Sequence, residues 1–157
     1  MNILGIDPGL SGGAVLLSGT TPRHIVKYTS ERDFVEFVRL MRDANVHSAF
    51  IEKVGAMPKQ GVSSTWKFAQ NYGFLRGTIR SFGIPLREVT PNQWQRGLGL
   101  PKRSKSTKTQ HKRNLLDACH RLLPGHPWTH ATGDAALIAL YGYEHLNHPG
   151  GQAAQAI

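Results

Sequence analysis

Short apolar runs near the N-terminus alternate with turn-forming residues. Residues 2–17 contain the runs ILGI and AVLL on either side of DPGLSGG, a pattern typical of two strands joined by a glycine-rich turn. Similar runs predict further strands at residues 23–28, 47–54 and 84–89. The strands up to residue 28 are therefore predicted to form a meander, and the later ones to follow helices.

Helical spacing of apolar residues begins after these first strands. Phe34, Phe37, Val38 and Met41 predict a helix that begins at Ser30. The same kind of pattern predicts helices at residues 65–82, 91–96, 109–123 and 132–146. The short third helix has Thr90 in place to cap it and Pro91 at its first position.

The order of these elements predicts the fold class. Strands come first, then alternate with helices, and the chain finishes helical, which indicates an α/β domain with a mixed sheet flanked by helices. A length of 157 residues suits one domain, predicted at residues 1–147 and followed by a flexible tail at residues 148–157. Residues 97–108 are rich in Gly, Pro, Ser and Lys and are predicted to be mobile.

Charge and cysteine content narrow the partners. The chain has 19 Lys+Arg against 10 Asp+Glu, a formal net charge of +9, which indicates a polyanionic partner. We expect nucleic acid and no membrane, because no run approaches the roughly 18 apolar residues of a spanning helix. The single cysteine, Cys119, cannot form an internal disulfide, and the N-terminus does not resemble a signal peptide, so we expect the cytoplasm.

The basic residues are densest just before the last two helices. We expect this segment to contact phosphates, with residues of the helix at 65–82 as additions. The segment contains Lys102, Arg103, Lys105, Lys108, Lys112 and Arg113, and the candidate additions are Lys67, Arg76 and Arg80.

Three of the few acids stand in unusual positions. Asp7 closes a buried strand, Glu52 follows the apolar AFI, and Asp134 begins an apolar helix. Each has a structural alternative. Asp7 could form an Asx turn, and a lysine such as Lys53 could neutralise Glu52. Asp134 could be a residue of the first helical turn that the helix dipole stabilises. Together, however, they can converge on one edge of the sheet.

Such a convergence predicts a metal site. Crowded carboxylates repel one another, so a cluster at neutral pH indicates a cation between them. Oxygen ligands without a His/Cys framework favour Mg²⁺ or Mn²⁺. Beside a basic surface, this cluster is typical of phosphodiester chemistry.

The motifs ILGIDPGLSGGAV, AFIEKV, KFAQNYGFLRG and GDAALIALYG resemble those of RuvC-type Holliday junction resolvases. VTPNQWQRGLGL is similar to the compact RuvC-like proteins of bacteriophages and prophages. The resemblance implies an RNase H-like fold with a mixed five-stranded sheet and a homodimer acting in the cytoplasm, that of a bacterial host if the protein is phage-encoded. It also implies a crossover junction endodeoxyribonuclease that resolves four-way DNA junctions by paired symmetric nicks, leaving 5′-phosphate and 3′-hydroxyl ends.

Residue by residue, the resemblance assigns roles. Asp7, Glu52 and Asp134 match three acids of the family's catalytic tetrad, which implies two metal ions bridged by Asp7. The position of the fourth acid is Ala131, and His130 is the candidate substitute because it stands four residues before Asp134, a spacing that puts two residues on one helix face. A further match, Lys108, implies a lysine near the scissile phosphate.

The sequence also departs from the family at several places. No aromatic residue stands near Gly55, where bacterial members place a wedge at the junction centre, and Met57 and Trp66 are substitutes at a different spacing. Another departure is Gln95 and Arg96 near the place of a family lysine. The helix at 65–82 is the expected dimer interface, unless its apolar residues Phe68, Phe74 and Leu75 are buried within the monomer.

Alternative functions remain at this point. GIDPGLSGG also resembles the phosphate-binding hairpin of actin-like ATPases, but that class needs two such domains, so no nucleotide cofactor is expected. Ala131 favours a junction-binding protein with impaired catalysis. A related nuclease acting on flaps, three-way branches or RNA/DNA hybrids is the other alternative.

Overall fold

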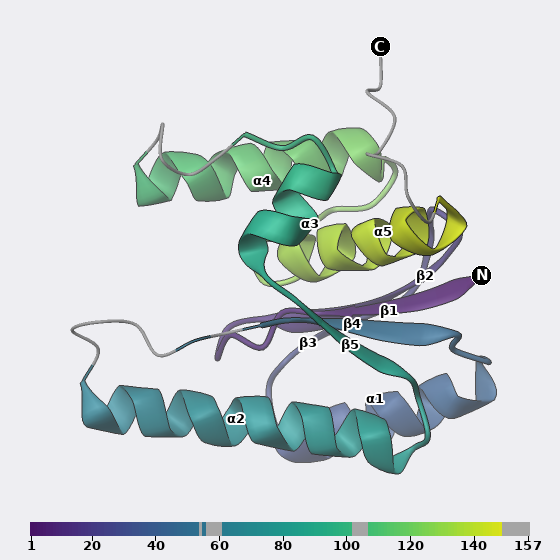
Figure 1. The fold of residues 1–157 in the computed structure, drawn as a ribbon, viewed down its shortest axis with the longest axis vertical. Coiled ribbons are helices and arrows are strands. Elements are labelled where there is room, and N and C mark those ends of the chain that lie inside the picture. The colour runs from purple at the N-terminus through teal and green to yellow at the C-terminus, as the bar shows by residue number, and fades with distance from the viewer. Residues whose placement is uncertain (54, 56–60, 102–106, 149–157) are drawn as a thin grey trace.

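A mixed sheet forms the centre of the molecule. The computed structural model describes residues 1–53, 55, 61–101 and 107–148. Within them, strands β1 to β5 lie in the order β3-β2-β1-β4-β5, antiparallel from β3 to β1 and parallel from β1 to β5 (Figure 1). Their bounds are Asn2–Ile6, Gly13–Ser18, Thr21–Lys27, Ser48–Glu52 and Leu86–Val89.

Helices cover both faces of this sheet. Figure 1 shows α1 and α2 on one face and α3, α4 and α5 on the other. Their bounds are Glu31–Asp43, Val62–Ser81, Pro91–Gly97, Lys108–Leu122 and Gly133–Asn147. This arrangement confirms the predicted fold class. None of these helices in the described part of the chain is long and apolar enough to cross a membrane.

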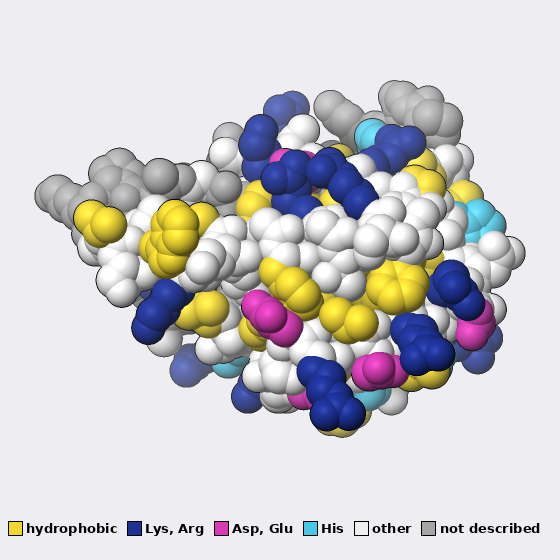
Figure 2. Space-filling view, turned by 90° about the horizontal axis from the view of Figure 1, so that it is seen from below, with side chains coloured by type: hydrophobic (Ala, Val, Ile, Leu, Met, Phe, Trp, Pro, Cys, Tyr) yellow, Lys and Arg dark blue, Asp and Glu magenta, His cyan; other side chains and the backbone are white. Residues whose placement is uncertain are grey.

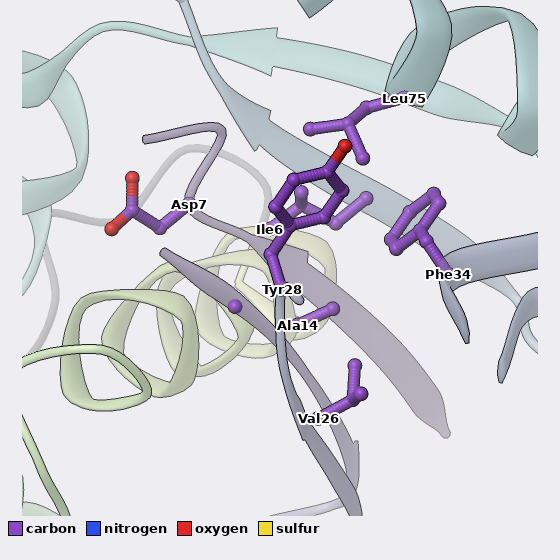
Figure 3. A pocket seen from close by; sticks show the side chains of 8 residues that line it. Ile6, Asp7, Ala14, Val26, Tyr28, Phe34 and Leu75 are labelled. Carbon is purple, nitrogen blue, oxygen red and sulfur yellow. The ribbon is translucent and has the colours of Figure 1, made fainter. Parts of the chain in front are cut away.

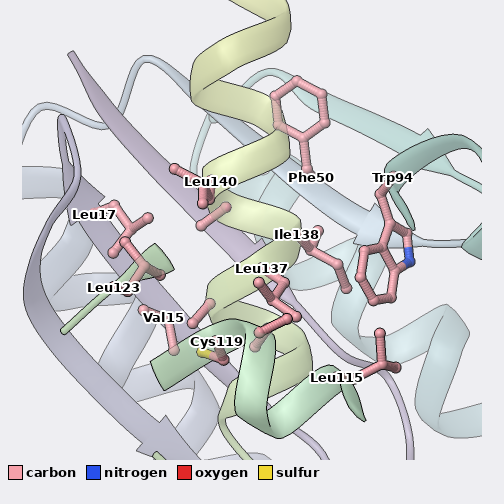
Figure 4. Close-up of a cluster of buried hydrophobic side chains, with 14 of the residues drawn as sticks. Val15, Leu17, Phe50, Trp94, Leu115, Cys119, Leu123, Leu137, Ile138 and Leu140 are labelled. Carbon is pink, nitrogen blue, oxygen red and sulfur yellow. The ribbon is translucent and has the colours of Figure 1, made fainter. Parts of the chain in front are cut away.

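Alternation along the strands divides the apolar residues into two clusters. In β1, Ile3 belongs to the cluster under α5, whereas Leu4 belongs to the cluster above α1 and α2. Successive side chains of a strand point to opposite faces, so a fully buried strand supplies both clusters. Figure 4 shows the cluster on the α5 side, where Phe50 and Trp94 lie with residues of α4 and α5.

Helix α5 approaches β1 very closely. A Cβ atom on Gly5 would overlap the backbone of Ala135 and Ala139, so only glycine fits at this point of the strand. Near the other end of α5, a Cβ atom on Gly142 would lie 2.5 Å from the ring of Phe50. Two glycines on facing elements thus allow the helix to pack directly on the sheet, which fixes the position of its first turn.

Several predicted boundaries differ from the structure. The strand predicted at 84–89 covers only Leu86–Val89, and the helix predicted from residue 65 begins at Val62. The prediction that residues 97–108 are mobile is wrong for the described part: Gly97 ends α3, Leu100 is only 7% exposed, and Lys108 begins α4. Leu100 packs into the α5-side cluster, which composition alone does not reveal. Residues 102–106 and 149–157 lie outside the described residues.

The single cysteine belongs to the core. Cys119 is buried on α4, and burial raises the pKa of its thiol to about 12, with the charge of Asp134 adding to the effect. A thiol this difficult to ionise is a poor nucleophile. The structure therefore supports the interpretation of Cys119 as a small buried hydrophobic residue.

Replacing Gly5 tests the close approach of α5. Gly5→Ala is expected to lower the free energy of unfolding by about 1–3 kcal/mol, because the added methyl group forces α5 away from β1. The matched control is Gly73→Ala on α2, where a Cβ meets nothing within 4 Å and the better helix former should add roughly 0.5–1 kcal/mol. Urea denaturation measures both. Equal stabilities for the two variants would contradict this account of the packing.

Candidate active site

Two carboxylates lie where parallel strands end. Asp7 directly follows β1, and Glu52 is the last residue of β4. Because Ile6 pairs with Ile51 in the parallel register, the residues that follow them reach the same edge of the sheet. Asp134 is the second residue of α5, which packs on β1, and it approaches this edge from the helix. The two strand ends and the start of α5 thus lie at one edge of the sheet.

The turn after β1 holds Asp7 in place. The backbone N–H of Gly9 donates to Oδ1 of Asp7 at 3.0 Å, which confirms the Asx turn that the sequence allowed. A Cβ atom on Gly12 would lie 2.8 Å from Cγ of Asp7, so glycine makes room for the carboxyl group. From α2, Nδ2 of the buried Asn71 donates to the carbonyl of Pro8 at 2.8 Å and anchors the turn. Figure 3 shows the Asp7 carboxylate pointing away from the apolar side chains beside it, such as those of Ile6 and Tyr28.

Glu52 has a tryptophan partner that the sequence did not suggest. Nε1 of Trp94 donates to Oε2 of Glu52 at 2.8 Å, across 42 positions of the chain. Lys53, named as an alternative partner for Glu52, is exposed, and among the described residues no salt bridge to Glu52 is present. Trp94 lies in the VTPNQWQ motif, but no local sequence pattern indicates that its side chain contacts Glu52.

The three carboxyl groups interact electrostatically. Burial raises the pKa of Glu52 to about 7, and the charges of Asp7 and Asp134 add to the rise, against the hydrogen bond from Trp94. Burial and the charge of Asp7 raise the pKa of Asp134 to about 7. Burial also raises the pKa of Asp7, offset in part by the Gly9 hydrogen bond and by Lys112. Removing these groups from water therefore disfavours their charged forms.

A cavity of about 400 Å³ opens beside two of these carboxylates. Asp7 and Asp134 line it together with Lys27, Lys112 and His130, while Glu52 is not among its lining residues. Small residues complete the wall: Gly9, Ser11, Gly12 and Ala131. Lys27 reaches this edge because the antiparallel register pairs it with Gly13, just after the Asp7 turn. Sequence reasoning missed Lys27, since no motif marks a lysine at a strand end.

His130 lies at the site, but for a different reason from the one predicted. The expectation that it shares a helix face with Asp134 is wrong, because α5 begins at Gly133, with Thr132 as its N-cap. His130 is exposed in the preceding turn and lines the same cavity. Ala131, in the place of the fourth family acid, also lines it and adds no charge.

The predicted basic residues fall into separate groups. Lys108, Lys112 and Arg113 are exposed on α4, and of these only Lys112 lines the cavity. Lys67, Arg76 and Arg80 lie on α2, on the opposite face of the sheet. The structure therefore does not bring α4 and α2 basic residues together. The remaining three, Lys102, Arg103 and Lys105, lie outside the described residues, as does Met57.

Glu88 of β5 engages both arginines of α2. Arg76 Nη2 lies 2.6 Å and Arg80 Nη2 3.8 Å from Oε1 of Glu88, while the hydroxyl of Tyr72 donates to Oε2 of Glu88 at 3.1 Å. The guanidinium of Arg76 also lies over the Tyr72 ring. The negative charge of Glu88 thus offsets part of the positive charge that we expected to contact phosphates.

The donor set suits a hard divalent cation. Carboxylate oxygens are the ligands that Mg²⁺ and Mn²⁺ prefer, and none of the three acids forms a salt bridge with another described residue. No group of three or more His, Cys, Asp and Glu side chains in the described ranges is already close enough to hold a metal ion. The acids thus fit the chemistry of a cation site, while their side chains are not gathered around a single point.

The architecture matches known structures. Thermus thermophilus RuvC superposes with a TM-score of 0.66 over 94% of this chain and 96% of that chain, at 17% sequence identity. The fold is that of RuvC. T. thermophilus RuvC in complex with a Holliday junction substrate gives a TM-score of 0.68 over 94% of this chain and 95% of that chain, at 16% identity. No protein-family model and no curated protein sequence matches the chain. The RuvC fold is RNase H-like, as the sequence resemblance implied.

The pH dependence of stability tests the burial of the carboxylates. Glu52 and Asp134 have pKa values of about 7 when folded, above their usual 4.5 and 3.8, so the folded protein binds more protons than the unfolded chain between those values. Without divalent metal, the free energy of unfolding is therefore expected to fall as pH rises from about 4 to about 7. Urea denaturation in EDTA measures the loss, which should be on the order of a few kcal/mol.

Two variants control this measurement. Asp134→Asn should show a smaller fall across the same pH range, because one of the buried ionisations is gone. Asp117→Asn, at an exposed position of α4, should behave as the wild type. A wild-type protein whose stability rises from pH 5 to pH 8 would contradict the assignment.

Proposed function

We propose that this protein is a divalent-metal-dependent endonuclease that resolves four-way DNA junctions. The observation that carries the proposal is the electrostatic coupling of three partly buried carboxylates, Asp7, Glu52 and Asp134, at one edge of a RuvC fold. Lysines beside this edge give it a means to hold phosphate, and a substrate of DNA suits a protein with a net charge of +9. Cytoplasmic DNA, in a bacterial host if the protein is phage-encoded, is the expected target.

The three carboxylates would bind the metal ions together. Asp7, Glu52 and Asp134 would hold Mg²⁺, with Mn²⁺ as substitute and two ions per site, and His130 lies at the cavity as a further candidate ligand. Bound there, the metal would supply Lewis-acid stabilisation of the negative charge that develops during phosphodiester hydrolysis. The Gly9 hydrogen bond orients Asp7 and the Trp94 hydrogen bond orients Glu52 before any substrate arrives. The products expected are 5′-phosphate and 3′-hydroxyl ends.

The lysines would position the DNA backbone. Lys112 and Lys27 line the cavity beside Asp7 and Asp134, so a phosphate bound between them would lie next to the carboxylates. Lys108 and Arg113 extend this positive surface along α4. Arg76 and Arg80 could contribute DNA contacts only from the α2 face, where Glu88 already engages them.

We propose a homodimer with α2 at its interface. Two equivalent sites related by a two-fold axis suit a substrate whose cleaved strands are also related by two-fold symmetry. Leu75 is buried and Phe74 packs edge-on against Phe34, so these residues belong to the monomer core. Val62 and Trp66, 88% and 64% exposed, leave the N-terminal half of α2 as the interface. Figure 2 shows the face of α1 and α2, with apolar side chains exposed on it.

A junction-binding protein with little catalysis is the second candidate. Ala131 stands where the family has its fourth acid, and the acids within the described residues are not gathered around one point. A panel of four-way, three-way, flap, RNA/DNA hybrid and linear substrates with Mg²⁺, Mn²⁺ or EDTA separates the candidates. Paired nicks in a four-way junction support the resolvase with two sites, binding without nicks supports the second candidate, and preference for another branch indicates a related nuclease.

Removing the carboxylate of Asp7 tests its catalytic role. Asp7→Asn is expected to lower the nicking rate by roughly 10²–10³-fold or more while leaving junction affinity within a few-fold of wild type, because the lost charge serves the reaction and not DNA contact. Gel-based nicking and electrophoretic mobility shifts measure the two quantities. The matched control, Asp43→Asn at the end of α1, should nick at the wild-type rate. Full activity of Asp7→Asn would overturn the assignment.

The salt dependence of binding tests the two lysines. Lys112→Gln and Lys27→Gln should each reduce the slope of log K against log [salt] by about 0.9, because each replaces one phosphate contact. Arg39→Gln, on the exposed side of α1, should leave the slope unchanged. Titrations of a fluorescent junction between 50 and 200 mM salt, a range in which such slopes are about linear, measure the effect. Slopes equal to wild type for both lysine variants would remove them from the DNA surface.

A further inference from the structure

Trp94 is the one residue of the short helix α3 that is buried in the core. The helix begins with a complete capping box, in which the Thr90 side chain accepts from the Gln93 N–H and the Gln93 side chain accepts from the Thr90 N–H. Pro91 occupies its first turn. These features fix the start of α3 right after β5, and they direct Trp94, which is 1% exposed, into the molecule.

The surroundings of the Trp94 ring connect it to the helices that carry other site residues. Trp94 belongs to the same apolar cluster as Leu115 of α4 and Ile138 of α5, and Figure 4 shows these side chains near the indole. Helix α3 packs on α5, with Gly97 against the ring of Tyr141. The indole therefore has a fixed place relative to α5, which carries Asp134.

The hydrogen bond to Glu52 uses an uncommon acceptor. A buried indole N–H needs a partner, and a backbone carbonyl is sufficient, as at Trp128, whose Nε1 donates to the Leu123 carbonyl at 2.7 Å. Trp94 instead donates to a partly buried carboxylate at 2.8 Å, and Glu52 forms no salt bridge with another described residue. Withdrawing an unpaired carboxylate even partly from water is costly, so satisfying Trp94 does not account for the arrangement.

From this geometry, and resting on the proposed function, we propose that Trp94 is a positioning residue for metal binding. Its N–H holds Oε2 of Glu52, restrains rotation of the carboxylate and leaves Oε1 as the oxygen offered to a divalent cation. A hydrogen bond that orients a metal ligand typically changes metal affinity by about 10–100-fold when it is removed.

The test compares two tryptophans of the same cluster. Trp94→Phe removes the N–H and a similar volume to Trp128→Phe, but only Trp94 contacts a carboxylate. Calorimetric titration of the full-length protein with Mn²⁺, in the absence of DNA, measures affinity, and thermal unfolding in EDTA measures stability. We expect both variants to lose stability to a similar degree, Trp94→Phe to bind Mn²⁺ at least about 10-fold more weakly, and Trp128→Phe to stay within about two-fold of wild type.

Other outcomes overturn the proposal in distinguishable ways. Wild-type affinity in Trp94→Phe, or an equal loss in Trp128→Phe, removes the positioning role and leaves the proposed nuclease intact. A wild-type protein that binds no Mn²⁺ overturns both. If Trp94→Phe fails to fold, β-(3-benzothienyl)alanine at position 94 keeps the ring shape without the N–H, and the same 10-fold loss is expected of it.

Discussion

Three partly buried carboxyl groups share one edge of the sheet, and the surrounding structure holds them there despite their mutual repulsion. Asp7 and Glu52 arrive there because β1 and β4 are parallel and in register, and Asp134 because α5 starts at the same edge. Burial raises all three pKa values, and repulsion from neighbouring carboxylates adds to the rise at Glu52 and Asp134, so the site opposes folding when its groups ionise without a cation. The apolar clusters on both faces of the sheet stabilise the fold against this electrostatic cost.

Close packing is what keeps the costly groups near one another. Gly5 lets α5 lie directly on β1, and this close contact fixes the position of the first helical turn, which carries Asp134. At Asp7, the Gly9 N–H and the Asn71 amide hold the turn from two sides. At Glu52, a core tryptophan takes one oxygen. Each acid is thus restrained by a different element, and the common edge is defined by the fold as a whole rather than by any one loop.

The sequence predicted this edge because its signals are local. A carboxylate that closes an apolar run, as Asp7 and Glu52 do, is visible within five or six residues, and alternation and helical spacing place it at a strand end. Trp94 and Lys27 could not be found in the same way, because their significance comes from pairing with residues distant in the chain. The spacing of four residues predicted that His130 shares a helix face with Asp134, but α5 begins three residues after His130. The composition of residues 97–108 predicts a mobile segment, yet Leu100 packs into the core.

Under the proposed function, the lysines and the carboxylates depend on each other. Lys112 lowers the pKa values of Asp7 and Asp134, so it stabilises their charged forms in the absence of DNA. A phosphate bound to Lys112 would draw on the same positive charge and bring a negative one beside the acids. A divalent cation held by these carboxylates would compensate for both effects, because its positive charge would offset the negative charge of carboxylate and phosphate. Cation and DNA should therefore favour each other's binding at this edge, and a net charge of +9 alone would not produce that coupling.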